Sequence, residues 1–302
     1  MTKVLSELIT ILALDRIEEN IFRGESQDLG WGRVFGGQVV GQALSAATQT
    51  VPPDRAVHSL HGYFLRSGDA TKPIVYLVDP SRDGRSFTTR RVVAVQEGET
   101  ILTLAASFQI DELGFEHQDA EMPDVPPPDG LLSERDLGSN FLRKLPDQVV
   151  AKIPSSMRGR FTADWPIEIR PVDPVDPLAP AKRPPRNCVW FRTNGALPDE
   201  PAIHRYLLAY ASDFHLLGTS LLPHGATWLQ PTMQVASLDH AMWFHRPVRF
   251  DDWLLYAMHS PASGGSRGLV SGRFFTRDGT LVASTMQQGL TRDRSGKKRG
   301  AP

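Results

Sequence analysis

The chain repeats its own sequence, and this repetition limits the fold more than any other feature. The motif SLHGYFLR at residues 59–66 returns as SLDHAMWFHR at residues 237–246, an offset of 237 − 59 = 178. The motif AASFQ at 105–109 returns as ASTMQ at 283–287, again offset by 178, and Gly-containing turns before Ser86 and Ser266 are offset by 180. Self-similarity at a fixed separation indicates a duplicated structural unit. We therefore expect two copies of one domain, in which a site can survive in only one copy.

Hydrophobic periodicity predicts the same order of elements in both copies. The first copy is expected to contain helices at 4–17 and from Gly36 onward, a short strand at 21–23, and strands at 58–65, 73–78, 86–96 and 100–109. The second copy is expected to contain a strand at 189–192, a helix at 203–217, and strands at 234–244, 253–258, 269–276 and 280–288. Asp-Gly and Gly-Gly pairs between strands are typical of hairpins, and hairpins build antiparallel sheets. The sequence therefore predicts an α+β fold in which two helix-on-sheet units continue one sheet edge to edge.

Four segments follow from this pattern. Residues 1–110 form the N-terminal copy and residues 188–292 form the C-terminal copy. Between them, residues 111–187 are rich in proline, which central strands do not accept, so we predict a surface connection with one helical island at about 133–152. The last segment, 293–302, is a basic tail that we expect to be disordered.

Composition excludes several classes of function. The net charge of −1 over 302 residues provides no field that would attract nucleic acid or acidic lipid. A single cysteine, Cys188, excludes an internal disulfide and a cysteine-rich metal site. No apolar signal segment and no run long enough to span a bilayer is present, so we expect a cytoplasmic protein without a membrane partner.

Two familiar catalytic patterns do not fit. Residues 264–268 match the spacing of a nucleophile elbow around Ser266, but a strand pattern follows the serine where the elbow requires a helix, and no histidine lies downstream. A hairpin turn explains these residues. Metal ligation is also not indicated, because His58 and His61 are expected on opposite faces of one strand. We therefore predict no bound metal.

Three polar residues in apolar surroundings remain in the second copy. Asp213 is predicted near the end of a helix, Ser237 in a strand and Gln287 in the last strand. Each also has an ordinary structural explanation, as a solvated helix-end carboxylate, a satisfied core hydroxyl and a strand-edge amide. Together they can hold one water molecule, with the carboxylate accepting a proton while the hydroxyl and the amide fix its orientation.

Four motifs in the chain resemble the bacterial acyl-CoA thioesterase II family. They are FGGQVVGQA at 35–43, HSLHGYFLR at 58–66, YASD at 210–213 and LDHAMWFHRP at 238–247. The resemblance runs from the first helix to about Arg292 and is least specific in the middle connection. It implies a double hot-dog fold, in which each half is an antiparallel sheet wrapped around a central helix.

The resemblance also implies an activity and a site. The family hydrolyses acyl-CoA thioesters to a free fatty acid and coenzyme A through a water activated by Asp, Thr and Gln. Asp213 and Gln287 match two of these positions, and Ser237 stands at the threonine position, where it keeps the hydroxyl but lacks the methyl group that stiffens χ1. Phe35 lies near the place of Asp213 in the first copy, so one functional site is expected per chain. The expected substrate-binding residues are Phe35, Gly36, Gly37, His58, Met242, Phe244 and Arg246.

Several points stay open at this stage. No cofactor is implied, since coenzyme A is part of the substrate, and relatives form homo-oligomers, so we expect a dimer or tetramer. The arginines considered for the coenzyme A phosphates are Arg66, Arg90, Arg91, Arg246 and Arg267. His215, two residues after Asp213, keeps a hot-dog hydratase or dehydratase in consideration, because a shared fold does not fix the chemistry. A non-catalytic acyl-CoA-binding protein is the third alternative.

Overall fold

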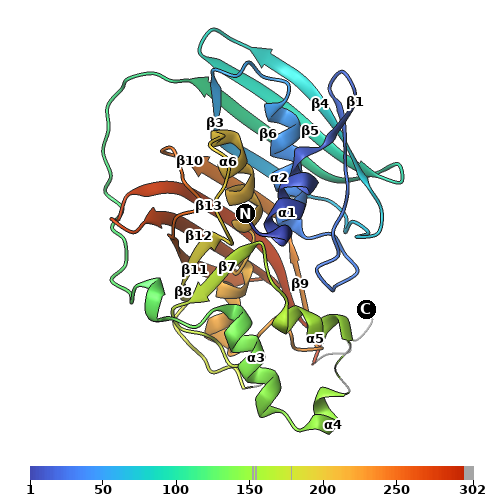
Figure 1. Cartoon of the computed structure of the whole chain (residues 1–302), viewed down its shortest axis with the longest axis vertical. Helices are drawn as coiled ribbons and strands as arrows, with labels where there is room; N and C mark the ends of the chain where they lie inside the picture. The colour runs from blue at the N-terminus through green and yellow to red at the C-terminus, as the bar shows by residue number, and fades with distance from the viewer. Residues whose placement is uncertain (152, 154, 178, 296–302) are drawn as a thin grey trace.

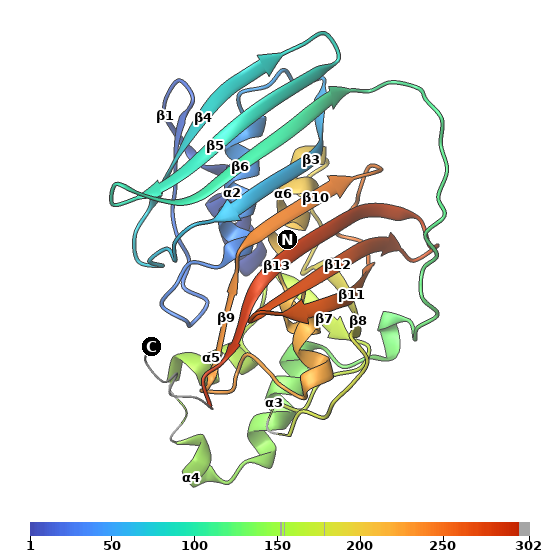
Figure 2. The ribbon, with the colours of Figure 1, turned by 180° about the vertical axis from the view of Figure 1, so that it is seen from behind.

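One antiparallel sheet of 13 strands extends through the whole molecule, and the main helices cover one of its faces (Figures 1 and 2). The computed structural model describes residues 1–151, 153, 155–177 and 179–295. The strand order is β1-β2-β4-β5-β6-β3-β10-β13-β12-β11-β8-β7, with β9 paired to β13 outside this path. The first copy supplies one half of the sheet, and the second copy supplies the other half together with one edge strand from the connection, which confirms the predicted edge-to-edge arrangement. None of the described helices combines the length and the apolar character needed to cross a membrane.

The first copy contains two helices and six strands. They are α1 (Lys3–Ala13), β1 (Asp15–Glu18), β2 (Ile21–Gly24), α2 (Gly36–Thr48), β3 (Arg55–Phe64), β4 (Ile74–Asp83), β5 (Phe87–Gln96) and β6 (Glu99–Ile110). The N-terminal helix ends at Ala13, earlier than predicted, because β1 and β2 form a hairpin in the following residues. The turn between β5 and β6 is Glu97-Gly98, with φ of 52° and 81°, the left-handed pair that a tight hairpin needs.

The connection between the copies holds more structure than one helical island. It contains η1 (Pro128–Gly130), α3 (Glu134–Lys144), α4 (Asp147–Val150), α5 (Ser155–Thr162) and the edge strand β7 (Ile167–Pro171). The predicted helix at 133–152 begins where expected, because Ser133 forms a capping box with Asp136. It is broken at Pro146, since the residue before a proline disfavours helical dihedrals and Leu145 is extended. Residues 296–302 of the predicted basic tail lie outside the described residues.

The second copy contains the remaining elements. They are β8 (Arg186–Thr193), α6 (Pro201–Ala211), η2 (Leu217–His224), β9 (Met233–Ser237), β10 (Asp239–Phe244), β11 (Leu254–Gly264), β12 (Arg267–Thr276) and β13 (Leu281–Asp293). Two predictions needed correction. The helix expected over 203–217 ends at Ala211, and a turn separates it from the 3-10 helix η2. The strand expected over 234–244 is interrupted at Leu238, whose N–H and C=O bond to Gln288 and Phe64.

A pseudo-twofold axis relates the two copies where β3 pairs with β10. Ala241 lies opposite His61, Asp239 opposite Tyr63 and Trp243 opposite Ser59. Because 241 − 61 equals 180, and residues 59 and 63 map by the same offset onto 239 and 243, the pairing is symmetric about the His61–Ala241 position. The duplicated units therefore meet through the same strand of each copy.

The register of the last strand corrects one offset drawn from the sequence. The N–H groups of Leu65 and Arg66 both donate to Ile101, at 2.9 and 3.4 Å, and those of His245 and Arg246 both donate to Val282, at 2.8 and 3.4 Å. The equivalent acceptors differ by 282 − 101 = 181 residues, whereas motif matching gave 178. On this register the first-copy counterpart of Gln287 is Ala106.

Helices α2 and α6 approach each other closely, and glycine permits this. A Cβ atom on Gly37 would lie 2.2 Å from the carbonyl oxygen of Tyr210, and one on Gly41 would lie 3.2 Å from that of Tyr206. Only glycine lets the backbones lie this close without a shift. The contact brings the N-terminus of α2, in the first copy, against the C-terminus of α6, in the second copy.

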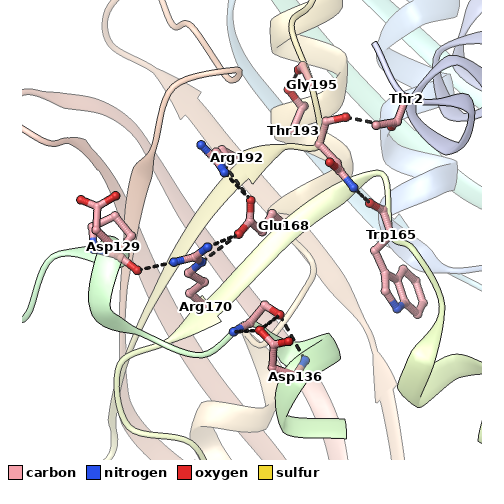
Figure 3. A network of polar contacts seen from close by, with 12 residues as sticks. Thr2, Asp129, Asp136, Trp165, Glu168, Arg170, Arg192, Thr193 and Gly195 are labelled. Atoms are coloured by element: carbon pink, nitrogen blue, oxygen red, sulfur yellow. Dashed lines mark hydrogen bonds and ion pairs between the residues drawn. The ribbon is translucent and has the colours of Figure 1, made fainter. Parts of the chain in front are cut away.

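Charged side chains cover the outer edge of the sheet. Figure 3 shows Glu168 on β7 between Arg170 and Arg192, with oxygen–nitrogen distances of 2.6 and 2.7 Å. Both guanidinium groups also lie over the ring of Trp253, at 5.1 and 4.4 Å from its centroid. Charges of this kind discourage a further strand from adding to an exposed edge.

Candidate active site

Asp213 lies in the turn that separates α6 from η2. The turn is closed by hydrogen bonds from Phe214 to Ala211 and from Leu216 to Phe214, at 3.0 and 2.8 Å. His215 has a left-handed φ of 62°, which costs on the order of 1 kcal/mol for a residue with a Cβ atom. Its Nε2 atom lies 2.8 Å from Oε1 of Glu134, so helix α3 of the connection helps to hold the turn.

The structure brings the three predicted catalytic residues together. Oδ1 of Asp213 accepts hydrogen bonds from Oγ of Ser237 at 3.2 Å and from Nε2 of Gln287 at 2.6 Å. Its other oxygen, Oδ2, faces the N-terminus of α2, where a Cβ atom on Gly36 would lie 2.7 Å away. The carboxylate is thus held through Oδ1, and Oδ2 lies against the backbone of Gly36 from the first copy.

A buried polar network supports this group, and its members were not recognised in the sequence. Nε2 of Gln287 also lies 3.3 Å from Nδ1 of His240, and Nε2 of His240 lies 2.8 Å from Oγ of Ser212. The hydroxyl of Tyr256 donates to the carbonyl oxygen of Ser212 at 2.9 Å. Burial lowers the pKa of His240, while Asp213 opposes that shift, and burial raises the pKa of Tyr256. The network is therefore neutral, with Asp213 at its end.

Aromatic side chains form a wall beside the carboxylate. Phe35 stacks on Phe214 with ring centroids 4.4 Å apart and meets the edge of Tyr210 at 5.2 Å. Trp31 from the first copy and Trp228 from the second meet edge to face at 5.9 Å. Stacked and edge-to-face contacts are the favourable arrangements for such rings. The wall is built by both copies, and Phe35 and Tyr210 within it are buried.

Most of the predicted substrate-binding residues lie on the helix-bearing side of the sheet. Phe35, Gly36 and Gly37 stand at the start of α2 next to Asp213. Met242 and Phe244 are buried and share a face of β10 with His240, because side chains alternate along a strand.

Two predicted residues are not brought to the site. A β-bulge between Val57 and Ser59 leaves His58 bonded to Oγ of Ser107 at 2.8 Å. Ser107 lies between the buried residues Ala106 and Phe108, so its side chain is on the outer face of the sheet. The bulge thus places His58 on the same outer face as His61, contrary to the simple alternation expected from the sequence.

Arg246 lies beyond the end of β10 that is farther from Ser237. Its guanidinium donates to the carbonyl oxygen of Leu281 at 3.1 Å. Among the other arginines considered for phosphate binding, Arg90 is only 3% exposed and is ion-paired with Asp83 at 2.7 Å. A buried, paired guanidinium cannot reach a ligand, so Arg90 is removed from the candidates.

The alternative sites offer no competing chemistry. Ser266 and Gly265 form the tight turn between β11 and β12, with φ of 60° and 56°, as the hairpin interpretation predicted. Within the described ranges, no group of three His, Cys, Asp or Glu side chains is placed to hold a metal ion. A surface pocket of about 370 Å³ lies by Arg192 and Arg249, but its residues do not include Asp213, Ser237 or Gln287.

Comparison with known proteins agrees with the resemblance seen in the motifs. The family model described as "Acyl-CoA thioesterase" matches residues 156–290, and "Acyl-CoA thioesterase N-terminal domain" matches residues 26–109. Acyl-CoA thioesterase 2 of Haemophilus influenzae is 45% identical over 292 residues, covering 97% of this chain and 99% of the relative.

Solved structures extend the comparison to the fold. An acyl-CoA thioesterase II, TesB2, from Mycobacterium marinum superposes with a TM-score of 0.76 and 46% identity, over 96% of this chain and 100% of that one. A hot-dog protein from Alicyclobacillus acidocaldarius, 19% identical, has a TM-score of 0.72 over 95% of this chain and 98% of its own. These matches confirm the predicted α+β double hot-dog architecture. The chain therefore belongs to the acyl-CoA thioesterase family and is a thioester hydrolase.

Proposed function

We propose that the protein hydrolyses fatty acyl-CoA thioesters to free fatty acid and coenzyme A by direct attack of a water molecule held by Asp213, Ser237 and Gln287. The observation that carries this proposal is the arrangement of the carboxylate. Two donors hold Oδ1 of Asp213, at 2.6 and 3.2 Å, which leaves Oδ2 as the oxygen able to accept a proton. A general base must be held in this way, with one oxygen directed at the reacting group.

The proposed reaction proceeds through one tetrahedral intermediate. As the water oxygen bonds to the thioester carbonyl carbon, one water proton passes to Oδ2 of Asp213. The intermediate then collapses with cleavage of the C–S bond, and the electron pair leaves on the sulfur of coenzyme A. The proton on Asp213 passes to the thiolate or to solvent, which restores the carboxylate.

The start of α2 is suited to stabilise the developing oxyanion. The first N–H group of this helix that bonds back to Phe35 is that of Gln38, at 3.0 Å. The N–H groups of Gly36 and Gly37 precede it, and the first N–H groups of a helix lack intrahelical partners. We propose these two groups as the oxyanion donors, since they open the helix at Gly36, where an added Cβ atom would lie 2.7 Å from Oδ2 of Asp213.

Thiol release from a series of acyl-CoA chain lengths tests the proposal. Wild-type protein should release coenzyme A, and Asp213→Asn should lower kcat by about 10²–10⁴-fold, the range expected for loss of a general base. If Asp213→Asn is folded and hydrolyses at the wild-type rate, this mechanism is wrong. A stoichiometric burst of coenzyme A ahead of fatty acid would indicate an acyl-enzyme, which direct attack by water does not form.

The hydratase alternative is separated by a second readout. His215, which kept it in consideration, pairs with Glu134 of the connection rather than with Asp213 or Gln287. Addition of water to an enoyl-CoA removes the absorbance of the conjugated double bond without releasing thiol. We expect thiol release and no such change. Binding of acyl-CoA without turnover would instead support a non-catalytic protein.

We further propose that the protein acts in fatty acid metabolism as a cytoplasmic homo-oligomer. Light scattering coupled to size-exclusion chromatography distinguishes a dimer or tetramer from a monomer of 33.4 kDa. Fractionation of cells that produce the protein tests its location.

A further inference from the structure

His240 is a buried histidine at the end of the polar network behind Asp213. Its side chain is 1% exposed, and both ring nitrogens have a partner. Nε2 lies 2.8 Å from Oγ of Ser212, and Nδ1 lies 3.3 Å from Nε2 of Gln287. His240 is thus linked to the carboxylate of Asp213 through the amide of Gln287 and forms no hydrogen bond with the carboxylate in this network.

The partners of His240 determine which ring nitrogen carries the proton. The hydroxyl of Ser212 donates its hydrogen to the carbonyl oxygen of Ala209 at 2.8 Å, near the end of α6. Oγ of Ser212 can then only accept from His240, so the ring hydrogen is on Nε2. In a neutral ring with Nε2–H, the other nitrogen, Nδ1, is an acceptor, and it faces the amide nitrogen of Gln287. Only with this tautomer do the hydroxyl of Ser212, the two ring nitrogens of His240 and the amide nitrogen of Gln287 all form hydrogen bonds.

The same logic fixes the amide of Gln287. Its Nε2 donates one hydrogen to Asp213 and the other to His240, so Oε1 is turned away from both. This oxygen is buried and has no hydrogen-bond partner within the part of the chain that the structure describes. A buried acceptor without a donor is costly, by about 1–3 kcal/mol, unless a ligand or water supplies one.

We infer that His240 is a positioning residue, whose Nε2–H tautomer holds the Gln287 amide with its nitrogen toward Asp213 and its oxygen free to accept from the attacking water. This inference rests on the proposed function of Asp213 and Gln287. The contact from His240 matters most during turnover. When Asp213 has accepted a proton on Oδ2, its Oδ1 is a neutral carbonyl oxygen that accepts more weakly from Gln287, whereas Nδ1 of His240 accepts as before. His240 therefore keeps the amide from rotating when the carboxylate is neutral.

The first copy, which has no equivalent site, lacks this pair of residues. Leu60 stands at the position of His240, and its cross-strand partner Ala106 stands at the position of Gln287. Asp213 directly follows Ser212, the C-cap residue of α6, and the residue that directly follows Gln49, the C-cap residue of α2, is Thr50. The prediction that Phe35 is the counterpart of Asp213 was wrong, because Phe35 precedes α2 at its other end. The histidine is thus present in the copy that has the glutamine and the carboxylate, whereas the other copy has Leu60, Ala106 and Thr50 at the three positions.

Two substitutions at His240 test the inference. His240→Leu places the first-copy residue in the site and removes the acceptor, so kcat should fall by about 10²-fold, as when a reacting group is misplaced by about 1 Å. KM should stay within about twofold, because the buried ring does not reach the substrate. His240→Asn puts Oδ1 near the place of Nδ1 and should keep kcat within about fivefold of wild type. His245→Leu, on the exposed His245 just beyond β10, is the matched control and should behave as wild type.

The outcomes separate this inference from the proposed function. If Asp213→Asn abolishes hydrolysis but folded His240→Leu retains the wild-type kcat, only the role of His240 is wrong. An equal loss in His240→Leu and His240→Asn would also contradict it, because a purely structural role gives no rescue by an acceptor. If Asp213→Asn itself is active, the proposed function fails first.

A measurement on the wild-type protein reports the tautomer directly and uses a variant only to assign the signals. Nitrogen-15 NMR of histidine-labelled protein distinguishes a protonated ring nitrogen from an unprotonated one. We expect the His240 signals, assigned by their loss in His240→Asn, to show Nε2 protonated and Nδ1 unprotonated at neutral pH. A Nδ1–H tautomer or a doubly protonated ring would overturn the inference.

Discussion

At the scale of single residues, the two hydrogen bonds on Oδ1 of Asp213 are unequal. Gln287 donates at 2.6 Å from a fully buried amide, whereas Ser237 donates at 3.2 Å from a half-buried hydroxyl. Shorter bonds to an ionised acceptor are the stronger ones. Gln287 is also held on its far side by His240, whereas Ser237 has a side chain that can rotate about χ1. The amide is therefore the firmer support of the carboxylate.

This difference predicts an order of effects. Ser237→Ala should lower kcat by about tenfold, and Gln287→Ala by about 10²–10³-fold, because the second change also leaves Nδ1 of His240 without a donor. Ser237→Thr keeps the hydroxyl and stiffens χ1, so it should match or exceed the wild-type kcat. Initial rates of thiol release at saturating substrate provide the comparison. If Ser237→Ala proves more damaging than Gln287→Ala, then the order of the two supports has been assigned wrongly.

At the scale of elements, the sequence predicted strands better than it predicted where helices break. Hairpin turns such as Glu97-Gly98 carry their own signal in residues that accept positive φ. Accordingly β3, β5 and β6 were located to within three residues, whereas β4 extends five residues beyond its predicted end. The break after Ala211 carried no such signal. Apolar residues continue at helical spacing through Phe214, and the left-handed conformation falls on His215 rather than on glycine or asparagine.

The same limits apply to the candidate site. Asp213, Ser237 and Gln287 were identified through motifs of the resembled family, but a lone buried histidine on a strand has no distinctive pattern, so His240 was missed. His58 was expected on the opposite face from His61, and this was wrong because a β-bulge adds one residue and reverses the alternation on which that prediction relied. Its expected place among the substrate-binding residues came from the resemblance instead. Contacts of this kind depend on strand register, which a short motif does not specify.

The close packing of α2 against α6 gives a prediction at this scale. Gly37→Ala places a Cβ atom 2.2 Å from the backbone oxygen of Tyr210, so the helices must separate, at a cost of about 1–3 kcal/mol. The Tm should fall by several degrees. In Gly36→Ala the added Cβ atom meets side-chain atoms instead and lies 2.7 Å from Oδ2 of Asp213. Compared with Gly37→Ala, this variant should show a smaller decrease in Tm and a larger decrease in kcat.

Thermal denaturation and thiol release on both variants check this contrast. Gly264→Ala, at a hairpin position where an added Cβ meets nothing within 4 Å, serves as the matched control and should change neither quantity. Equal loss of Tm in Gly36→Ala and Gly37→Ala would show that the two glycines do not have separate roles.

At the scale of the whole molecule, the two copies are related by a pseudo-twofold axis but contribute different groups to the site. The strands β3 and β10 join the sheets symmetrically, yet the pair His240 and Gln287 on β10 and β13 has Leu60 and Ala106 at the same cross-strand position of the first copy. The first copy contributes the start of α2 and the ring of Phe35 to the site of the second. Because residues of both copies surround Asp213, neither copy alone provides the complete site.

Buried neutral histidines make the stability of this assembly depend on pH. Burial lowers the pKa of His240, against opposing effects of Asp213 and Asp239, and burial together with Arg249 lowers the pKa of His204. His204 also has a fixed tautomer, since the N–H of Phe250 donates to its Nδ1 at 3.0 Å. A proton on Nδ1 of either ring would face a donor, so the folded protein holds both rings neutral.

The sign of the pH dependence follows from proton counting. In the unfolded chain these histidines take up protons below their ordinary pKa of about 6.5, while the folded protein does not until a lower pH. The unfolded state then binds more protons, so the stabilising contribution is complete above about pH 6.5 and is lost as the pH falls toward the folded values. Carboxylates with lowered pKa, such as Asp28 and Asp251, lose their contribution only at still lower pH.

Thermal denaturation at several pH values therefore tests the neutral network. The Tm of the wild-type protein should be lower at about pH 5 than at about pH 7.5. His240→Asn removes one of the titrating rings and should reduce this difference, whereas His224→Asn, at an exposed position at the end of η2, should leave it unchanged. If the wild-type Tm at about pH 5 is as high as at about pH 7.5, the folded state binds as many protons as the unfolded state over this range. His204 and His240 could not then both be neutral, and the tautomer that orients Gln287 would lose its basis.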